Sequence, residues 1–283
     1  MGEKHEKISE NLIAKGTIQE TMLGPLWARA NYSKLYPEML KDDMAFEIIE
    51  KVDYDFSETK EFLTGKNDFR ALGLLVRSKQ FDNALLKYME KYPQATIVNI
   101  GAGLDTTFFR VDNGKIKWYN LDLPNAIEYR KQFIKEGPRN KCISNSALDF
   151  NWFNEVEWSE EDGIFFIIGG LTYYFKEEDL RKLFLAMVGH FSGGEIVFDV
   201  MSKLAIKKFN QLAKKMGKDE VVYFSVKNPE SIFPQWSDKI QVLDWFPIWS
   251  RTKINQNWNK RTIKMIKLTR RLKTSKIVLL KFQ

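Results

Sequence analysis

The sequence is poor in the residues that most often carry acid–base, nucleophilic or metal chemistry. Its 283 residues include one cysteine, Cys142, and two histidines, His5 and His190. A single cysteine excludes an internal disulfide framework and suits a reducing compartment, so we expect a cytoplasmic protein. His190 falls at the end of a predicted helix, which we interpret as a structural position rather than that of a base. Neither a Ser-His-Asp arrangement nor a metal-ligand spacing is evident, so no metal is expected.

Long apolar runs are also missing. The longest, "GIFFIIGGLTYYF" from Gly163 to Phe175, is too short to span a bilayer and is interrupted by two glycines. The amino-terminal "MGEKHEKISENLIAKG" is charged and lacks the apolar core of a signal peptide. These features predict a soluble protein without a membrane partner.

Acidic residues are absent from Arg251 to Gln283, within a chain of net charge +7. Such a basic block can mark a nucleic-acid surface. No DNA- or RNA-binding signature accompanies it, so we interpret it as a solvated helix face beside a final strand. A basic surface that attracts an anionic small substrate is an intermediate interpretation.

The periodicity of the apolar residues changes near residue 94. Residues 1–93 show helical spacing and predict a helical N-terminal cap. Residues 94–283 alternate short β-branched or aromatic runs with helical stretches, which is typical of an α/β domain with a mostly parallel sheet and helices on both faces. Seven strands are expected, at 95–101, 116–122, 141–146, 163–170, 195–202, 239–246 and 276–282. The irregular stretch 203–238, with a basic helix and the apparent loop "SIFPQWSD", is a predicted substrate lid.

The segment "NIGAGLDT" ends the first of these strands. Gly101 and Gly103 can adopt backbone angles closed to other residues and leave room for a ligand beside the backbone. Asp105 and Thr106 are expected to offer side-chain oxygens to the amides that begin the next helix. Ligands in open α/β sheets bind beyond the carboxyl ends of the strands, where this turn lies. A purely structural turn is the alternative.

An acidic residue, Asp122, ends the second predicted strand about 20 residues after the glycines, the position at which a carboxylate meets the ribose hydroxyls of an adenosine ligand. A helix cap before Pro124 is the alternative. The dinucleotide pattern requires a third glycine where Thr106 stands, which argues against NAD or FAD. No P-loop is present. S-adenosylmethionine, which has no phosphate, is the remaining common ligand.

Four segments in this order resemble the leucine carboxyl methyltransferase family, which includes the tetracenomycin-type polyketide O-methyltransferases. They are "IVNIGAGLDTTFFR", "WYNLDLPNAIEYRK", "SALDFNW" and "GGLTYYF". The resemblance extends to "TMLGPLWARA", "DDMAFEIIEKVDYDF" and the final "KIVLLKF", and so covers most of the chain. It implies a Rossmann-like class I methyltransferase fold with a helical cap, in which S-adenosylmethionine is converted to S-adenosylhomocysteine.

The resemblance also assigns roles to single residues. Gly101, Ala102 and Gly103 line the methionine part of the donor, and Asp122 with Leu123 holds the ribose. Arg77, in "LLVRSKQFD", matches the family arginine that reaches the donor carboxylate; a surface arginine on an amphipathic helix is the alternative. Arg29, in "WARA", is a second candidate for a cationic contact.

Two positions depart from the leucine carboxyl methyltransferase pattern. Ser146 and Ala147 replace the Asp-Leu that flanks the adenine, and Asp149 either takes over the adenine amine or caps the next helix. Gly169 stands where the family has a glutamate at the end of the fourth strand. These changes argue against a protein substrate and favour a small-molecule acceptor.

A carboxylate acceptor needs no general base, because it is ionised at neutral pH, which agrees with the scarcity of histidine. We therefore expect methyl transfer to the carboxylate of a small, polyketide-like acid, with Tyr173 and Tyr174 orienting the acceptor. A phenol or alcohol acceptor would require a base, such as Asp149 or a water-linked tyrosine. Three further alternatives are a non-catalytic S-adenosylmethionine-binding protein, a nucleic-acid methyltransferase or binder, and a dinucleotide dehydrogenase.

Overall fold

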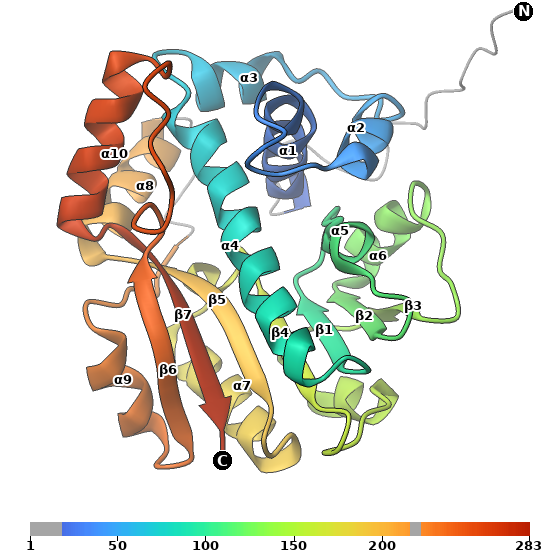
Figure 1. Ribbon diagram of the computed structural model, residues 1–283. Helices are drawn as coiled ribbons and strands as arrows, with labels where there is room; N and C mark the ends of the chain where they lie inside the picture. The colour runs from blue at the N-terminus through green and yellow to red at the C-terminus, as the bar shows by residue number, and fades with distance from the viewer. Residues whose placement is uncertain (1–18, 216–221) are drawn as a thin grey trace, which may run out of the picture.

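The computed structural model describes residues 19–215 and 222–283 (Figure 1). Its helical elements before the sheet are η2 (Gln19–Met22), α1 (Leu23–Leu35), α2 (Asp43–Ile49), α3 (Ser57–Thr64) and α4 (Phe69–Lys91). The strands are β1 (Thr96–Ile100), β2 (Lys117–Asp122), β3 (Asn140–Ser144), β4 (Ile164–Ile168), β5 (Glu195–Met201), β6 (Ile240–Pro247) and β7 (Ser275–Phe282). Between them lie α5 (Thr107–Val111), α6 (Pro124–Lys131), η3 (Phe150–Glu155), η4 (Thr172–Tyr174), α7 (Glu177–His190), α8 (Lys203–Lys215), α9 (Pro229–Trp236) and α10 (Lys260–Leu272).

The seven strands form one sheet in the order β3-β2-β1-β4-β5-β7-β6. All neighbours pair in parallel except β7, which runs antiparallel to both β5 and β6. Strands β1 and β4 are buried along their whole length, as central strands covered on both faces must be. The predicted fold class and the seven predicted strands are confirmed, with ends shifted by two residues at most.

Helix α4 covers one face of the sheet, crossing it beside β1, β4 and β5 (Figure 1). Its apolar side, including Leu75 and Leu85, joins Ile97 of β1 and Phe165 of β4 in one buried cluster. Helices α1, α2 and α3 gather near the start of α4, at the end of the sheet where the parallel strands finish (Figure 1). Pro25 lies in the first turn of α1, where no partner for its missing N–H is needed, and so it does not break the helix. The division at residue 93 into a cap and a second domain stays a prediction.

The other face of the sheet packs against α7 and α9 around a second core that contains Phe184, Phe198 and Phe233. The prediction of a loop at "SIFPQWSD" is wrong, because residues 229–236 form helix α9. The Asn228 side chain caps its start by accepting from Glu230 N–H, and Phe233 and Trp236 bury its apolar side. Pro234 inside the segment suggested a loop, but packing overrides that local signal. The lid role of 203–238 stays a prediction, and residues 216–221 of it lie outside the described part.

The basic block forms the connection from β6, helix α10 and strand β7. Arg251 is paired with Asp244 at 2.7 Å. Helix α10 lies at the outside of the molecule (Figure 1), and its lysines and arginines are exposed. Over residues 19–215 and 222–283, no helix combines the length and the apolar character that crossing a bilayer requires. The expectations about nucleic acid and about membranes otherwise stay predictions.

Candidate functional site

The glycine turn directly follows β1, at the carboxyl edge of the parallel strands. Gly101 has φ +72° and Gly103 has φ +43°, both in the left-handed region that favours glycine. A Cβ on Gly101 would lie 2.7 Å from Cδ2 of Leu171, and one on Gly103 would lie 3.1 Å from Cβ of Met22. The backbone of the turn therefore runs close to two other segments, and side chains at either position would push them apart.

Asp122 meets this turn from the end of β2. Its Oδ2 accepts a hydrogen bond from the backbone N–H of Gly103 at 2.7 Å, and its Oδ1 accepts one from Leu123 N–H at 2.7 Å. Burial raises the pKa of Asp122. Asp122 does not cap α6, which begins at Pro124, because Leu123 occupies the cap position and makes no side-chain cap hydrogen bond. The predicted acid and the predicted glycine turn are thus brought into contact.

Two buried arginines hold the carbonyl groups of the turn. Arg130 Nη1 donates to the carbonyls of Gly103 at 2.9 Å and of Asp105 at 2.7 Å. Arg29 Nη2 donates to the carbonyl of Leu104 at 2.8 Å. In this structure Arg29 therefore binds the backbone of the turn. The sequence offered no signal that would have identified Arg130.

Asp42 is the centre of a buried network that joins the first helices to this turn. Its carboxylate accepts from Arg29 Nε at 2.9 Å, from Arg110 Nη1 at 2.7 Å and from the Thr106 hydroxyl at 2.7 Å. It also caps α2 through Ala45 N–H at 3.1 Å. Its side chain is fully shielded from solvent. A lone Asp-Asp pair before a helix predicts such a cap, but not the partners that lie 64 and 68 residues further along the chain.

The prediction for the two residues that begin the next helix is confirmed for Asp105 and wrong for Thr106. The Asp105 carboxylate accepts from Thr107 N–H at 2.8 Å. Thr106 makes no cap hydrogen bond, because its hydroxyl donates to Asp42 instead. Burial alone would raise the pKa of Asp105, but the charges of Arg29 and Arg110 outweigh it and lower that pKa. The turn is consequently built on ionised, paired groups.

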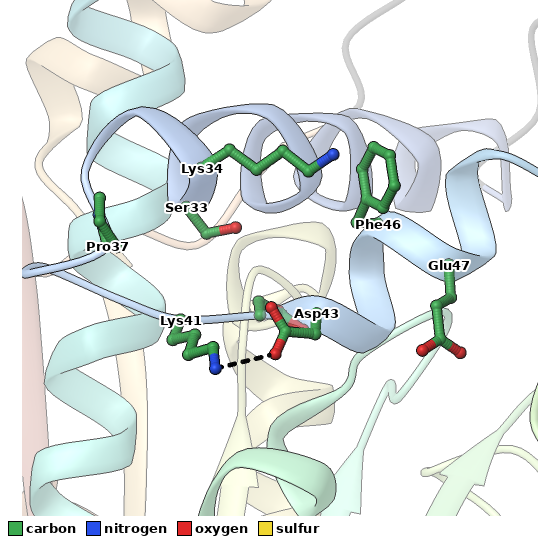
Figure 2. A pocket seen from close by; sticks show the side chains of 8 residues that line it. Ser33, Lys34, Pro37, Lys41, Asp43, Phe46 and Glu47 are labelled. Atoms are coloured by element: carbon green, nitrogen blue, oxygen red, sulfur yellow. Dashed lines mark ion pairs between the residues drawn. The ribbon is translucent and has the colours of Figure 1, made fainter.

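A cavity of about 230 Å³ lies beside this network, between α1 and α2. Figure 2 shows Lys34 reaching toward the ring of Phe46 on one side, and Lys41 paired with Asp43 at 3.2 Å on the other. Asp42 also lines it, but its carboxylate is already used by Arg29 and Arg110. Lys41, Asp43 and Asp42 are therefore engaged in ion pairs, Lys34 lies over the Phe46 ring, and we assign the cavity no ligand.

Arg77 reaches the carboxyl edge from α4 and meets the ends of β4 and β5. Its Nη1 lies 3.3 Å from Oδ2 of Asp199, and the two side chains are only 12% and 10% exposed. Asp199 Oδ1 also accepts from Gly170 N–H at 2.6 Å. Burial alone would lower the pKa of Arg77, but the charge of Asp199 outweighs it and raises that pKa. Arg77 is therefore no surface arginine, and Asp199 is a site residue that the sequence analysis missed.

Tyr173 and Tyr174 follow β4 and contact each other, with ring centroids 5.1 Å apart. Tyr173 also interacts with Arg77. Burial, and then the charge of Asp199, raises the pKa of Tyr173, so its hydroxyl keeps its proton at neutral pH. Burial likewise raises the pKa of Tyr174. Both tyrosine hydroxyls therefore stay protonated at neutral pH.

The positions that depart from the family pattern have clear local surroundings. Ser146 and Ala147 form a turn after β3, in which the Ser146 hydroxyl accepts from Leu148 N–H at 3.2 Å. Asp149 is exposed and caps η3 by accepting from Asn151 N–H. A Cβ on Gly169 would lie 2.9 Å from Cε2 of Phe81, so that ring fills the direction in which a side chain at 169 would leave the backbone.

His190 lies away from this edge. His190 is the last residue of α7 and packs its ring against Phe153 and Phe191, at the opposite end of the helix from the carboxyl edge of β4. Within the described ranges, no group of three or more His, Cys, Asp or Glu side chains is placed to hold a metal ion. The candidate site therefore consists of a glycine turn, an acid on β2 and a buried Arg–Asp pair.

A parallel sheet with one antiparallel strand near its edge, a glycine turn after β1 and an acid after β2 define the class I methyltransferase fold. The chain belongs to the leucine carboxyl methyltransferase family, whose sequence model matches residues 22–188. It is an S-adenosylmethionine-dependent methyltransferase of that family.

One curated relative is the tetracenomycin polyketide synthesis O-methyltransferase TcmP of Streptomyces glaucescens. It is 26% identical over 218 residues, which are 76% of this chain and 77% of TcmP. Two crystal structures share the fold at low identity. One is a putative methyltransferase from Thermobifida fusca, with a TM-score of 0.60, 9% identity, and coverage of 90% of this chain and 94% of that one. The other is a DUF574 family protein from Streptomyces avermitilis, with a TM-score of 0.59, 10% identity, and coverage of 91% and 97%.

Proposed function

We propose that this protein transfers the methyl group of S-adenosylmethionine to the carboxylate of a small, polyketide-like acid. The observation that carries the proposal is the junction of Gly103 and Asp122, which brings the glycine turn and a partly buried acid together at 2.7 Å in a chain of this family. The relative TcmP, by its name an O-methyltransferase of polyketide synthesis, supports oxygen as the methylated atom and a polyketide as the acceptor class.

The residues at the carboxyl edge fit the donor. Gly101 and Gly103 carry no Cβ, so other groups can come close to the backbone of the turn, as Leu171 and Met22 do at 2.7 Å and 3.1 Å from the two ideal Cβ positions. Asp122 uses one lone pair of each carboxylate oxygen on a backbone N–H. An ionised carboxylate has about four acceptor positions, which leaves capacity for the two ribose hydroxyls. Ala102 and Leu123 are their neighbours in the same two turns, and Arg77 is the cation for the donor carboxylate.

The donor, when bound, supplies a methyl group on a positively charged sulfur. A carboxylate oxygen displaces such a sulfur without first losing a proton, so the protein needs to align the reactants and exclude water. Tyr173 and Tyr174 fit the role of hydroxyl donors that orient an anionic acceptor, because both pKa values are raised and both hydroxyls stay protonated. Arg77 adds positive charge beside them.

The positions of Asp149 and His190 support a carboxylate over a hydroxyl acceptor. Asp149, the candidate base in that alternative, is exposed and caps η3. His190 packs among aromatic rings at the far end of α7. Neither Asp149 nor His190 is therefore placed to take the proton of a phenol or an alcohol.

Titration calorimetry and a turnover assay test the proposal. The wild type is expected to bind S-adenosylhomocysteine, and Asp122→Ala to lose most of that affinity. Asp112→Ala is the matched control, because Asp112 pairs with the partly exposed Arg139 and makes no contact with the turn. Formation of S-adenosylhomocysteine with aromatic carboxylic acids, but not with their methyl esters, is the expected turnover result. Methylation of phenols alone would favour the hydroxyl alternative, and binding without turnover on either panel would favour a non-catalytic role.

A further inference from the structure

The Arg77–Asp199 pair lies where the donor's amino-acid end has to be held. Strand β4 lies between β1 and β5 in the sheet, so the end of β5 is two strand spacings, about 10 Å, from the glycine turn. Close contacts join the two places. A Cβ on Gly101 would lie 2.7 Å from Cδ2 of Leu171. A Cβ on Gly170, the residue before Leu171, would lie 2.7 Å from Nη1 of Arg77. The pair and the turn are therefore parts of one continuous edge.

Both members of the pair have unused hydrogen-bonding capacity. Asp199 accepts from Gly170 N–H through Oδ1 and faces Arg77 through Oδ2, which uses about half of its acceptor positions. Arg77 has five N–H donors and meets Asp199 through Nη1 alone, without the two-point contact that an arginine and a carboxylate can form. A cation and an anion that are both about 90% buried and joined by one 3.3 Å contact are complementary to a ligand group that itself carries both charges.

A second observation concerns Gly169. The family pattern places a carboxylate there, but Phe81 lies 2.9 Å from the ideal Cβ position of Gly169 in this chain. A carboxylate reaches this corner from the neighbouring strand instead, because Asp199 accepts a hydrogen bond from the N–H of Gly170, the residue after Gly169. An acid is therefore present at this corner of the edge, supplied by β5 rather than by β4.

We infer that Asp199 binds the ammonium group of the donor's amino-acid end, beside the carboxylate that Arg77 is proposed to hold, so that the two residues form one subsite for a zwitterion. The inference rests on the proposed donor site and adds Asp199 to it as a specificity-determining residue. Adenosine-containing molecules without the amino-acid part gain nothing from this subsite. The protein then distinguishes S-adenosylmethionine from adenosine sulfur compounds without the amino-acid part at the end of β5.

Calorimetry with three probes tests this role. The probes are S-adenosylhomocysteine, its deaminated analogue that keeps the carboxylate, and methylthioadenosine, which has neither group. Asp199→Asn keeps an acceptor oxygen for Gly170 N–H but removes the charge. We expect it to weaken S-adenosylhomocysteine binding by about tenfold or more, the range of a hydrogen bond between charged groups. Its affinity for methylthioadenosine is expected to stay within about twofold of the wild-type value.

Two further variants complete the test. Asp112→Asn breaks a different aspartate–arginine pair, with Arg139, and is expected to change none of the three affinities. Arg77→Gln is expected to weaken S-adenosylhomocysteine but still to bind it more tightly than the deaminated analogue, because Asp199 remains. It also keeps the inference testable if Asp199→Asn does not fold.

The outcomes separate the inference from the proposed function. Equal losses of all three probes in Asp199→Asn would make Asp199 a purely structural residue and overturn the inference, as would unchanged binding of S-adenosylhomocysteine. Equal affinity of Arg77→Gln for S-adenosylhomocysteine and its deaminated analogue would overturn it as well. A wild type that binds none of the probes would overturn the proposed function itself.

Discussion

The Asp122 carboxylate accepts a hydrogen bond from the Gly103 amide at 2.7 Å, so the acid at the end of β2 and the turn at the end of β1 form one structural unit. An acid held in this way is buried, and burial raises its pKa. The group that we assign to the donor ribose therefore carries a cost when it ionises in the folded protein.

This cost predicts how the stability of the protein depends on pH. Because the folded pKa of Asp122 lies above its unfolded value, the folded protein binds the proton more tightly, and the contribution of Asp122 to stability falls as pH rises through the interval between the two values. Asp122→Asn has no such titration. The difference in unfolding free energy, wild type minus Asp122→Asn, is expected to decrease as the pH rises above about 4 in urea titrations. A difference that grows over this interval would show that hydrogen bonds outweigh burial at Asp122.

The glycine turn is expected to need Gly101 for the close contact as well as for its backbone angle. Gly101→Ala places a residue with a Cβ at φ +72° and 2.7 Å from Leu171, whereas Gly114→Ala meets a similar φ of +79° in open space. Both substitutions are expected to lower stability by about 1–2 kcal/mol for the left-handed angle. Only Gly101→Ala is expected to lose further stability and to weaken S-adenosylhomocysteine. Equal effects of the two, measured by denaturation and calorimetry, would contradict this.

Asp42 and Asp43 are neighbours with opposite expected sensitivities. Asp42→Asn leaves Arg29 without its buried partner charge and removes one of the two buried carboxylates that pair with Arg110, the other being Asp82, which is expected to cost about 3 kcal/mol or more. Asp43→Asn breaks only the exposed pair with Lys41, and a change below about 1 kcal/mol is expected. Chemical denaturation of both variants measures the contrast. A loss of similar size in the two would mean that the buried network contributes no more than a surface ion pair.

We expect that the Phe81 ring leaves no room for a side chain at position 169, where the family has a glutamate. Gly169→Ala puts a Cβ 2.9 Å from the Phe81 ring, and overpacking of this kind costs about 1–3 kcal/mol. Adding Phe81→Leu is expected to relieve part of that cost, with a coupling energy of at least about 0.5 kcal/mol in a double-mutant cycle. Gly189→Ala, in helix α7 with open space at its Cβ position, is the control and is expected to be neutral or stabilising. Strict additivity of the first two changes would show that the ring moves aside freely.

Local pattern was enough to predict the sheet and part of the site. Apolar runs of strand length, separated by helical periods, mark all seven strands, because a buried parallel strand needs a continuous apolar stretch and each crossover needs a helix. Gly101, Gly103 and Asp122 were identifiable because glycines after a strand and an acid after the next one occupy fixed places in this fold. Helix α9 was missed because Pro234 reads as a breaker, while the burial of Phe233 and Trp236 keeps the segment helical.

The sequence by itself therefore determined the order of the strands along the chain, the glycine turn and the acid that follows it, since each depends on neighbours a few residues away. Only the tertiary structure decided which distant charges meet: Asp42 with Arg110, and Asp199 with Arg77, which lie 68 and 122 residues apart. A buried charge requires a partner, but burial and pairing arise from the packing of whole elements. Nothing in the local pattern records which arginine will reach which acid.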